Sequence, residues 1–323
     1  MNWVRALKFG LLLLAASLPA PAATGALDLL KSGRADDALR ELQLRIQKNP
    51  ADAEAFNLMG RVYFQLELWD DAIHAAEKSV ELLPSSSEYH QWLGRAYGEK
   101  ADSIGSFGAM SLVRKVKNEF ERAVALDTRV ANLSARADLA EFYIEAPGFM
   151  GGDKDKAADL AQFVMKYDAA QGHYIAARLA QERKDKAVAE QEYKAAIEAS
   201  GNSAHSWINL ASFYRKAGRH EDMESAVNRA VAAPAGNGIS LFDGASLLLR
   251  DRRNFSGAID MLHRYLALEN QSEEGPAFVA HFLLGMLLEK QGDKQTAAKE
   301  YRAALAMASQ YKKAQDALAR VSR

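Results

Sequence analysis

Residues 53–86 read AEAFNLMGRVYFQLELWDDAIHAAEKSVELLPSS, and residues 87–100 start the same pattern again with SEYHQWLGRAYGEK. Five positions of the first stretch recur 34 positions later: Phe56, Met59, Gly60, Arg61 and Tyr63 are matched by His90, Leu93, Gly94, Arg95 and Tyr97. A fixed period of this length is typical of stacked units that contact only their neighbours. Although a length of 323 residues would ordinarily suggest about two globular domains, the period predicts a single solenoid.

Each unit carries two helical patterns separated by a turn. In residues 204–237, apolar and small residues recur every three or four positions in two groups, which is the spacing of one helix face. Residues 216–219, between the groups, read KAGR and contain a glycine of the kind that ends helices. The first group is Trp207, Leu210, Ala211 and Tyr214, and the second is Met223, Val227 and Ala230. The unit is therefore predicted to be a pair of helices.

This pattern resembles the tetratricopeptide repeat, a family whose unit is a pair of antiparallel helices. The resemblance implies an all-α fold: a right-handed α-solenoid of about eight helix-turn-helix repeats with a C-terminal capping helix. Small residues at positions eight, twenty and twenty-seven of the unit let two helices approach to about 8–10 Å. The recurring tyrosines are accordingly expected in the core: Tyr63, Tyr97, Tyr214 and Tyr301. The expected units are residues 24–52, 53–86, 87–130, 133–169, 170–203, 204–237, 239–272 and 278–311, with the capping helix at 312–322.

Residues 1–23 have the features of a secretory signal. Arg5 and Lys8 precede an apolar run of ten residues, too short to cross a membrane, and a small-residue site follows it. We expect cleavage near Ala22 or Ala23, which leaves a mature chain without an integral membrane span. Because the chain has no cysteine, we expect a bacterial protein that is periplasmic or secreted. The rival interpretation is an uncleaved segment that holds the chain at the membrane.

Two units carry extra residues between their predicted helices. The unit at 87–130 has ten added residues after Tyr97, and the unit at 133–169 has about five around residues 146–154. Insertions at the same place in neighbouring units are predicted to emerge on one edge and to contact each other around Phe107 and Phe149, where they could form a binding edge. The alternative is that they pack on each other and on the adjoining helices. The residues concerned are Phe107, Met110, Phe149 and Met150.

Composition and motifs argue against an enzyme, a metal site and a nucleic-acid binder. Lys and Arg total 41 against 42 Asp and Glu, so the basic excess of a nucleic-acid-binding protein is missing. The seven histidines form no His-Glu-x-x-His pattern, and the glycine-rich residues 148–154 lack the ending of a phosphate-binding loop. Carboxylate pairs such as Glu273 and Glu274 fall at predicted turns and are expected to be solvated. We therefore expect no catalytic activity, no cofactor and no metal.

The resemblance implies that a partner binds on the concave side. The first helix of each unit lines this side, with positions two, five, six, nine, twelve and thirteen of the unit facing inward. The lysines and asparagines with which one subgroup grips a C-terminal carboxylate are replaced in this chain, so that recognition is not expected. The expected function is an exported, non-enzymatic scaffold or adaptor that binds a peptide or protein segment in the groove. The alternatives are a cell-envelope structural or assembly component and, more remotely, an enzyme whose residues converge from several units. The candidate partner-binding residues are Asn57, Arg61, Gln91, Trp92, Arg95, Asp138, Glu141, Tyr174 and Arg178.

Arg61 and Arg95 occupy equivalent positions in successive units, and Trp92 lies one turn before Arg95. Neighbouring first helices pack at about 10 Å, so two guanidinium groups could hold one anionic group of a partner beside the indole. The alternative is a surface pair between Arg95 and Glu99, four residues apart. The binding hypothesis predicts that charge reversal at both arginines weakens partner capture and leaves thermal unfolding nearly unchanged.

Overall fold

The structure is a computed structural model that describes residues 25–104, 106–233, 238–269 and 271–322, and for residues 106 and 107 the backbone alone. The described residues form α-helices and one 3-10 turn, and their only extended pairing is an isolated bridge between Ser272 and Gly275. The helices are α1 (Ala26–Lys31), α2 (Ala35–Lys48), α3 (Ala53–Gln65), α4 (Trp69–Leu82), α5 (Ser87–Ile104), α6 (Ser106–Leu126), α7 (Leu133–Glu145), η1 (Gly148–Met150), α8 (Lys154–Met165), α9 (Ala169–Glu182), α10 (Lys186–Ala199), α11 (Ala204–Lys216), α12 (His220–Ala232), α13 (Ile239–Asp251), α14 (Phe255–Leu266), α15 (Ala277–Lys290), α16 (Lys294–Met307) and α17 (Lys312–Val321).

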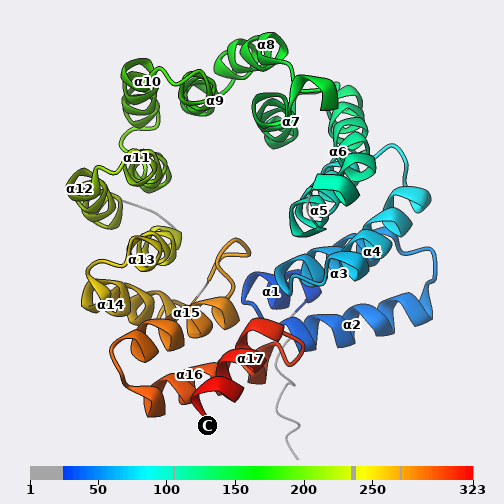
Figure 1. The fold of residues 1–323 in the computed structure, drawn as a ribbon. Coiled ribbons are helices and arrows are strands. Elements are labelled where there is room, and N and C mark those ends of the chain that lie inside the picture. The colour runs from blue at the N-terminus through cyan, green and yellow to red at the C-terminus, as the bar shows by residue number, and fades with distance from the viewer. Residues whose placement is uncertain (1–24, 105, 234–237, 270, 323) are drawn as a thin grey trace, which may run out of the picture.

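The fold class expected from the sequence is confirmed. Consecutive helices pack as the antiparallel pairs α1–α2 to α15–α16, and α17 follows as a single helix (Figure 1). Side-chain oxygens at the N-caps bind the first free amides of many of these helices, which fixes where each begins. Such caps are Asp52, Asn132, Asp153, Asp168, Asp185, Ser203, Asn254 and Asp293.

Small residues allow the two helices of a pair to meet. A Cβ atom added to Gly94 on α5 would lie 2.6 Å from the ring of Phe120 on α6. The equivalent atom on Gly285 of α15 would lie 2.5 Å from the ring of Tyr301 on α16. These two rings are buried, so a side chain on either glycine would force the helices apart. The predicted role of the eighth position as a close-approach site is confirmed in these two pairs.

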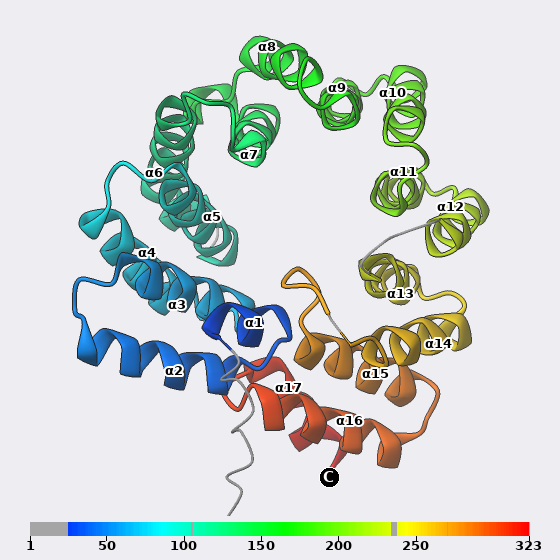
Figure 2. The ribbon, with the colours of Figure 1, turned by 180° about the vertical axis from the view of Figure 1, so that it is seen from behind.

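The pairs are arranged in a ring whose two ends meet. The first helix of each pair lies on the inside and the second on the outside, and α16 and α17 lie beside α1 and α2 in both views (Figure 1 and Figure 2). One hydrophobic cluster joins Leu30, Leu39 and Leu58 from the first units to Phe278 and Tyr311 near the C-terminus. The ring is therefore closed by apolar packing between segments far apart in the sequence.

Helix α17 has a larger role than that of a cap. It packs on α15 and α16, as expected of a capping helix. Its surroundings also include the first units: the Nζ atom of Lys313 lies 2.5 Å from Oε1 of Glu67 on the α3–α4 turn, and Ala314 belongs to the cluster that closes the ring. The sequence predicted a helix that covers only the last unit, whereas the described helix also packs against the first units of the chain.

One of the two insertions is helical. The added residues after Tyr97 lengthen α5 to 18 residues and α6 to 21 residues, so the loop predicted between residues 98 and 110 does not form in the described residues. Residues 98–110 lack proline, and their Glu, Lys, Ala and Met favour helix. The second insertion is a loop with the single turn η1, because Pro147 and the glycines around it interrupt the helical pattern.

Candidate functional site

The inside of the ring contains a cavity of about 1270 Å³. Its wall is formed by residues of α1, α3, α4, α5, α6, α7, η1, α13 and α15, and by the connection of α14 to α15 at residues 271–276. Aromatic side chains and carboxylates share the lining. The aromatic residues are Phe64, Trp69, Trp92, Phe120 and Phe142, and the acidic residues include Glu67, Glu99, Asp102, Asp138, Glu141, Glu145, Glu273 and Glu274. A cavity of this size, formed mainly by the first helices of the pairs, is the candidate binding site.

An aromatic row runs along one wall. The ring of Phe64 lies 5.3 Å from that of Trp69 and 5.7 Å from that of Trp92, in edge-to-face arrangements. Trp92 was predicted from the sequence, whereas Phe64 and Trp69 were not. Phe64 occupies position twelve of its unit, one of the positions that the resemblance places on the inner side, so that rule would have identified it. Trp69 starts the second helix, and no repeat position singled it out.

Arg61 and Arg95 lie on either side of Trp92 in the chain, and both contact its indole. Their Cζ atoms lie 4.9 and 4.8 Å from the ring centroid, within the range of a cation–π interaction. The structure thus brings the three predicted residues together. Each guanidinium, however, is already paired with a carboxylate of the chain itself: Arg61 with Glu273 and Arg95 with Asp138.

The pair between Arg61 and Glu273 joins residues that are 212 positions apart. The Nε atom of Arg61 donates to Oε1 of Glu273 at 2.9 Å, Nη2 donates to Oε2, and Nη1 donates to Glu88 at 3.1 Å. Burial alone would lower the pKa of Arg61, but the hydrogen bond and charge of Glu273 raise it. The expectation that Glu273 is solvated was wrong, because its side chain is only 17% exposed against α3.

Arg95 and Gln91 form a polar network with the next unit. Arg95 Nε donates to Oδ2 of Asp138 at 2.6 Å, and Gln91 Nε2 donates to the same oxygen at 2.8 Å. The alternative partner considered for Arg95 was Glu99, but Arg95 pairs with Asp138, and the charges of Asp102 and Glu67 act on Glu99. Desolvation and these two negative charges raise the pKa of Glu99. Arg95 therefore stabilises the α5–α7 interface.

Arg178 completes a similar pattern on α9. It donates to both carboxylate oxygens of Glu141, at 2.9 and 2.8 Å, and to Glu145 at 2.5 Å. Burial alone would lower the pKa of Arg178, but the hydrogen bond and charge of Glu141 raise it. Tyr174 lies partly buried one turn before Arg178, with its ring 6.3 Å from that of Tyr193. Two of the predicted residues, Arg178 and Glu141, thus meet, but they form an ion pair with each other within the inner wall.

Two predicted partner-binding residues are buried. Asn57 is 2% exposed and Gln91 is 3% exposed, so in this closed ring they support the inner helices and do not present a surface to a partner. The Nδ2 atom of Asn57 has no hydrogen-bond partner among the described residues. The inner position of a repeat does not by itself predict exposure, because neighbouring first helices cover part of it: Gln91 Nε2 donates to Ser134 and Asp138 of α7.

The residues predicted at the insertion edge have different surroundings. Phe149 on η1 is 81% exposed and Met110 on α6 is 50% exposed. Met150 lines the cavity, and a Cβ atom on Gly151 would lie 2.9 Å from Lys117 of α6, so the second insertion lies against α6. The side chain of Phe107 is outside the described residues. Its predicted contact with Phe149 therefore stays a prediction.

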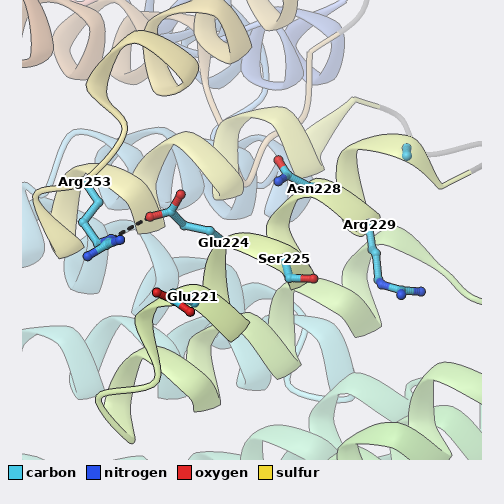
Figure 3. Close-up of a pocket in the computed structure, with 7 residues that line it drawn as sticks. Glu221, Glu224, Ser225, Asn228, Arg229 and Arg253 are labelled. Carbon is cyan, nitrogen blue, oxygen red and sulfur yellow. Dashed lines mark hydrogen bonds and ion pairs between the residues drawn. The ribbon is translucent and has the colours of Figure 1, made fainter.

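An open depression on the outer helix α12 offers less enclosure than the central cavity. It is lined by Glu221, Glu224, Asn228, Arg229 and Arg253, and Arg253 donates to Glu224 at 2.6 Å (Figure 3). Among the described residues, no cluster of His, Asp and Glu is arranged to hold a metal ion. Within the same part of the chain, none of the helices is both long enough and apolar enough to cross a membrane.

Comparison with known proteins agrees with the geometry. The sequence pattern of the tetratricopeptide repeat matches residues 24–99 and 244–320, and a second pattern of the same description matches residues 204–236. The chain belongs to the tetratricopeptide repeat family. This membership supports a protein-interaction scaffold, the role that tetratricopeptide repeat folds generally have.

Individual relatives of this tetratricopeptide repeat protein are distant. The chain is 26% identical over 129 residues to the cytochrome c-type biogenesis protein CycH of Bradyrhizobium diazoefficiens, and the match spans 40% of this chain and 31% of CycH. The crystal structure of yeast Tom70 matches with a TM-score of 0.53 at 14% identity, over 94% of this chain and 65% of that one. A tetratricopeptide repeat protein from Parabacteroides merdae matches with a TM-score of 0.46 at 12% identity, over 92% of this chain and 96% of that one.

Proposed function

We propose that this tetratricopeptide repeat protein is an exported, non-enzymatic scaffold that binds a peptide or protein segment inside its ring. The observation that carries the proposal is the central cavity of about 1270 Å³, whose wall combines an aromatic row with charged side chains. Aromatic faces provide apolar contact area at low cost in side-chain entropy, and charged groups beside them give orientation. Export is supported by the pattern of residues 1–23, which lie outside the described residues.

The proposal can be tested by placing a photo-crosslinking amino acid at matched inner and outer positions. Glu99 on α5 lines the cavity, and Arg122 is an exposed residue of α6, the outer helix of the same pair. In cells that produce the chain, the Glu99 variant should form a defined crosslinked adduct after irradiation, while the Arg122 variant should not. Mass spectrometry of the adduct identifies the partner and the crosslinked segment.

Three results would contradict the proposal. Equal adducts from both positions, or adducts from Arg122 alone, would place the binding surface on the outside. An adduct at Glu99 that contains only a small molecule would replace the polypeptide partner by another class of ligand. Both variants should retain the helical content and the melting temperature of the unmodified chain, which excludes crosslinks from unfolded protein.

A second candidate function is an assembly component of the cell envelope, held at the membrane by an uncleaved N-terminal segment. The local similarity to a cytochrome c-type biogenesis protein supports this candidate, because that relative is named for an assembly process. Intact-mass measurement after cell fractionation separates the two candidates. A mass that includes residues 1–22 together with recovery in the membrane fraction supports the assembly component, and a shorter mass in the soluble fraction supports the exported scaffold.

A further inference from the structure

Residues 271–276 lie inside the ring, on the surface where a partner is proposed to bind. They connect α14 to α15 and project toward α1 and α3 in both views (Figure 1 and Figure 2). Their base is fixed by Tyr265, which is fully buried on α14. Its hydroxyl donates to the carbonyl of Gly275 at 2.5 Å and accepts from the amide of Ser272 at 2.9 Å. The base of this connection is thus part of the core.

The tip of the connection is held by two side chains of α3 that lie one helical turn apart. Arg61 donates to both carboxylate oxygens of Glu273, and Gln65 Nε2 donates to the backbone carbonyl of the same residue at 3.0 Å. One residue is therefore recognised twice, through its side chain by a guanidinium and through its backbone by an amide. A bidentate ion pair combined with a main-chain hydrogen bond is a suitable way to recognise an extended peptide.

The recognition of the tip by Gln65 is incomplete. The Nε2 atom also donates to the carbonyl of Leu30 at 3.3 Å, but the Oε1 atom is buried and accepts no hydrogen bond from the described residues. An extended peptide offers both a carbonyl and an amide N–H, so it could satisfy both ends of the Gln65 amide. The chain's own segment satisfies only one end. A buried acceptor without a partner is unfavourable, which favours a ligand that supplies the missing donor.

The tip is also polar and can be replaced. Ser272 and Glu273 are only partly buried, and Glu274 is exposed. The contacts of Glu273 with α3 are an ion pair and a hydrogen bond, both of which another carboxylate-bearing peptide can form. Buried apolar anchors in the connection are limited to its base, where Gly275 approaches Ile239 and Phe242 of α13.

We propose that residues 272–274 are a resident occupant of a peptide site on α3, and that the partner displaces them with an extended acidic segment whose Glu or Asp carboxylate binds Arg61. This inference rests on the proposed function, because it specifies the chemistry of the segment bound inside the ring. While residues 272–274 occupy α3, the chain's own Glu273 competes with the partner. The affinity for the partner therefore depends on how easily these residues leave α3.

The probe is the capped peptide Gln-Ser-Glu-Glu-Gly, which has the sequence of residues 271–275. It is titrated into the ¹⁵N-labelled chain while the indole N–H signal of Trp92 is followed, because this ring contacts Arg61. The indole signal of Trp207 on α11 serves as the internal reference. Glu273→Gln removes the competing carboxylate with little change of shape, and Glu274→Gln makes the same charge change at the exposed neighbour.

The Glu273→Gln variant should bind the peptide at least about tenfold more tightly than the unmodified chain and the Glu274→Gln variant. Adding Arg61→Met to Glu273→Gln should abolish the shift of the Trp92 signal, as should a peptide with Gln in place of its first Glu. Thermal melts confirm that each variant is folded. If Glu273→Gln is too unstable, replacement of residues 272–274 by glycine tests the same site.

Two results would overturn the proposal: equal affinity of the unmodified chain and both Gln variants for the peptide, or no binding of the peptide to the Glu273→Gln variant. Either result would show that the tip is a fixed structural part of the ring. The two proposals fail separately. Crosslinking at Glu99 without peptide binding refutes the resident occupant alone. Peptide binding without any crosslinked polypeptide in cells refutes the scaffold function alone.

Discussion

The backbone amide of Ser309 donates hydrogen bonds to both carboxylate oxygens of Asp36, at 3.2 and 3.0 Å, although the two residues are 273 positions apart. Asp36 lies in the first turn of α2, and Ser309 lies between α16 and α17. The contact lies at the edge of the apolar cluster that closes the ring.

Tyr311 is central to the closure of the ring. It is 2% exposed, and its ring lies 5.0 Å from Phe278 and 5.4 Å from Phe282. Tyr311→Ala should lower the free energy of unfolding by roughly 3 kcal/mol, because it leaves a cavity among aromatic rings. It should also increase the radius of gyration in small-angle scattering. Phe149→Ala, at a residue that is 81% exposed, should change neither quantity measurably. An unchanged radius for Tyr311→Ala would show that the closure does not depend on this ring.

Gly33 marks a close approach between the α1–α2 turn and the start of α15. Its φ is +70°, and an added Cβ would lie 2.5 Å from the backbone nitrogen of Ala277. Gly218 has a similar φ of +75° with nothing within 4 Å of an added Cβ. Gly218→Ala should cost about 1 kcal/mol from backbone strain alone. Gly33→Ala should cost clearly more in chemical denaturation, because the backbone of α15 must shift. Equal losses would mean that the first unit can move away from α15 freely.

The pair between Arg61 and Glu273 should contribute to stability, since the two side chains are only 13% and 17% exposed. Arg61→Glu should lower the free energy of unfolding by about 3 kcal/mol, because two carboxylates would then face each other. The double exchange Arg61→Glu with Glu273→Arg should restore part of this loss. A double-mutant cycle of denaturation curves measures the coupling. The expected loss of stability differs from the sequence-based prediction that charge reversal leaves thermal unfolding nearly unchanged. That prediction assumed that Arg61 is solvated.

Asp243 on α13 should make stability depend on pH. Burial raises its pKa to about 7, the negative charge of Glu274 adds to this effect, and Arg250 opposes it. The folded chain therefore binds this proton more tightly than the unfolded chain does, so the stabilisation is complete below the unfolded pKa. It declines as the pH rises through about 7, and the total loss is on the order of a few kcal/mol.

Asp243→Asn should remove this dependence because the amide is neutral at every pH. The variant should be more stable than the unmodified chain at pH 8 and similar to it at pH 4, as measured by urea denaturation. Asp159→Asn, at an exposed residue of α8, is the matched control and should follow the unmodified chain at both pH values. A pH 8 difference of the same size in both variants would assign the effect to net charge and not to Asp243.

The sequence was sufficient to predict the helix pairs because their determinants are local. Gly94 and Gly285 recur at one repeat position, and the packing of each against its neighbouring ring depends on residues within the same unit. The prediction of a loop after Tyr97 was wrong. The repeat period places a turn there, but the helical propensity of the added residues extends α5 and α6 instead.

The closure of the ring could not be predicted in the same way. It depends on a small rotation between neighbouring units that accumulates over the whole array, and no single repeat encodes that sum. The residues that meet at the closure, such as Asp36 and Ser309, carry no pattern that links them. The same reason explains the pair of Arg61 with Glu273. A guanidinium at an inner position was predictable, whereas the carboxylate that reaches it comes from a connection outside the repeat pattern.

Closure also limits how many units the ring can contain. An open array can gain or lose a helix pair through local change at one junction, and its remaining pairs keep their geometry. In the closed ring of the described residues, a pair removed between α5 and α14 would force every remaining junction to bend more sharply or would separate Tyr311 from the first units. Duplication of a pair would push the same surfaces apart. The length of this array is therefore set by its circumference, and its evolution by whole-unit insertion or deletion is restricted to changes that open the ring.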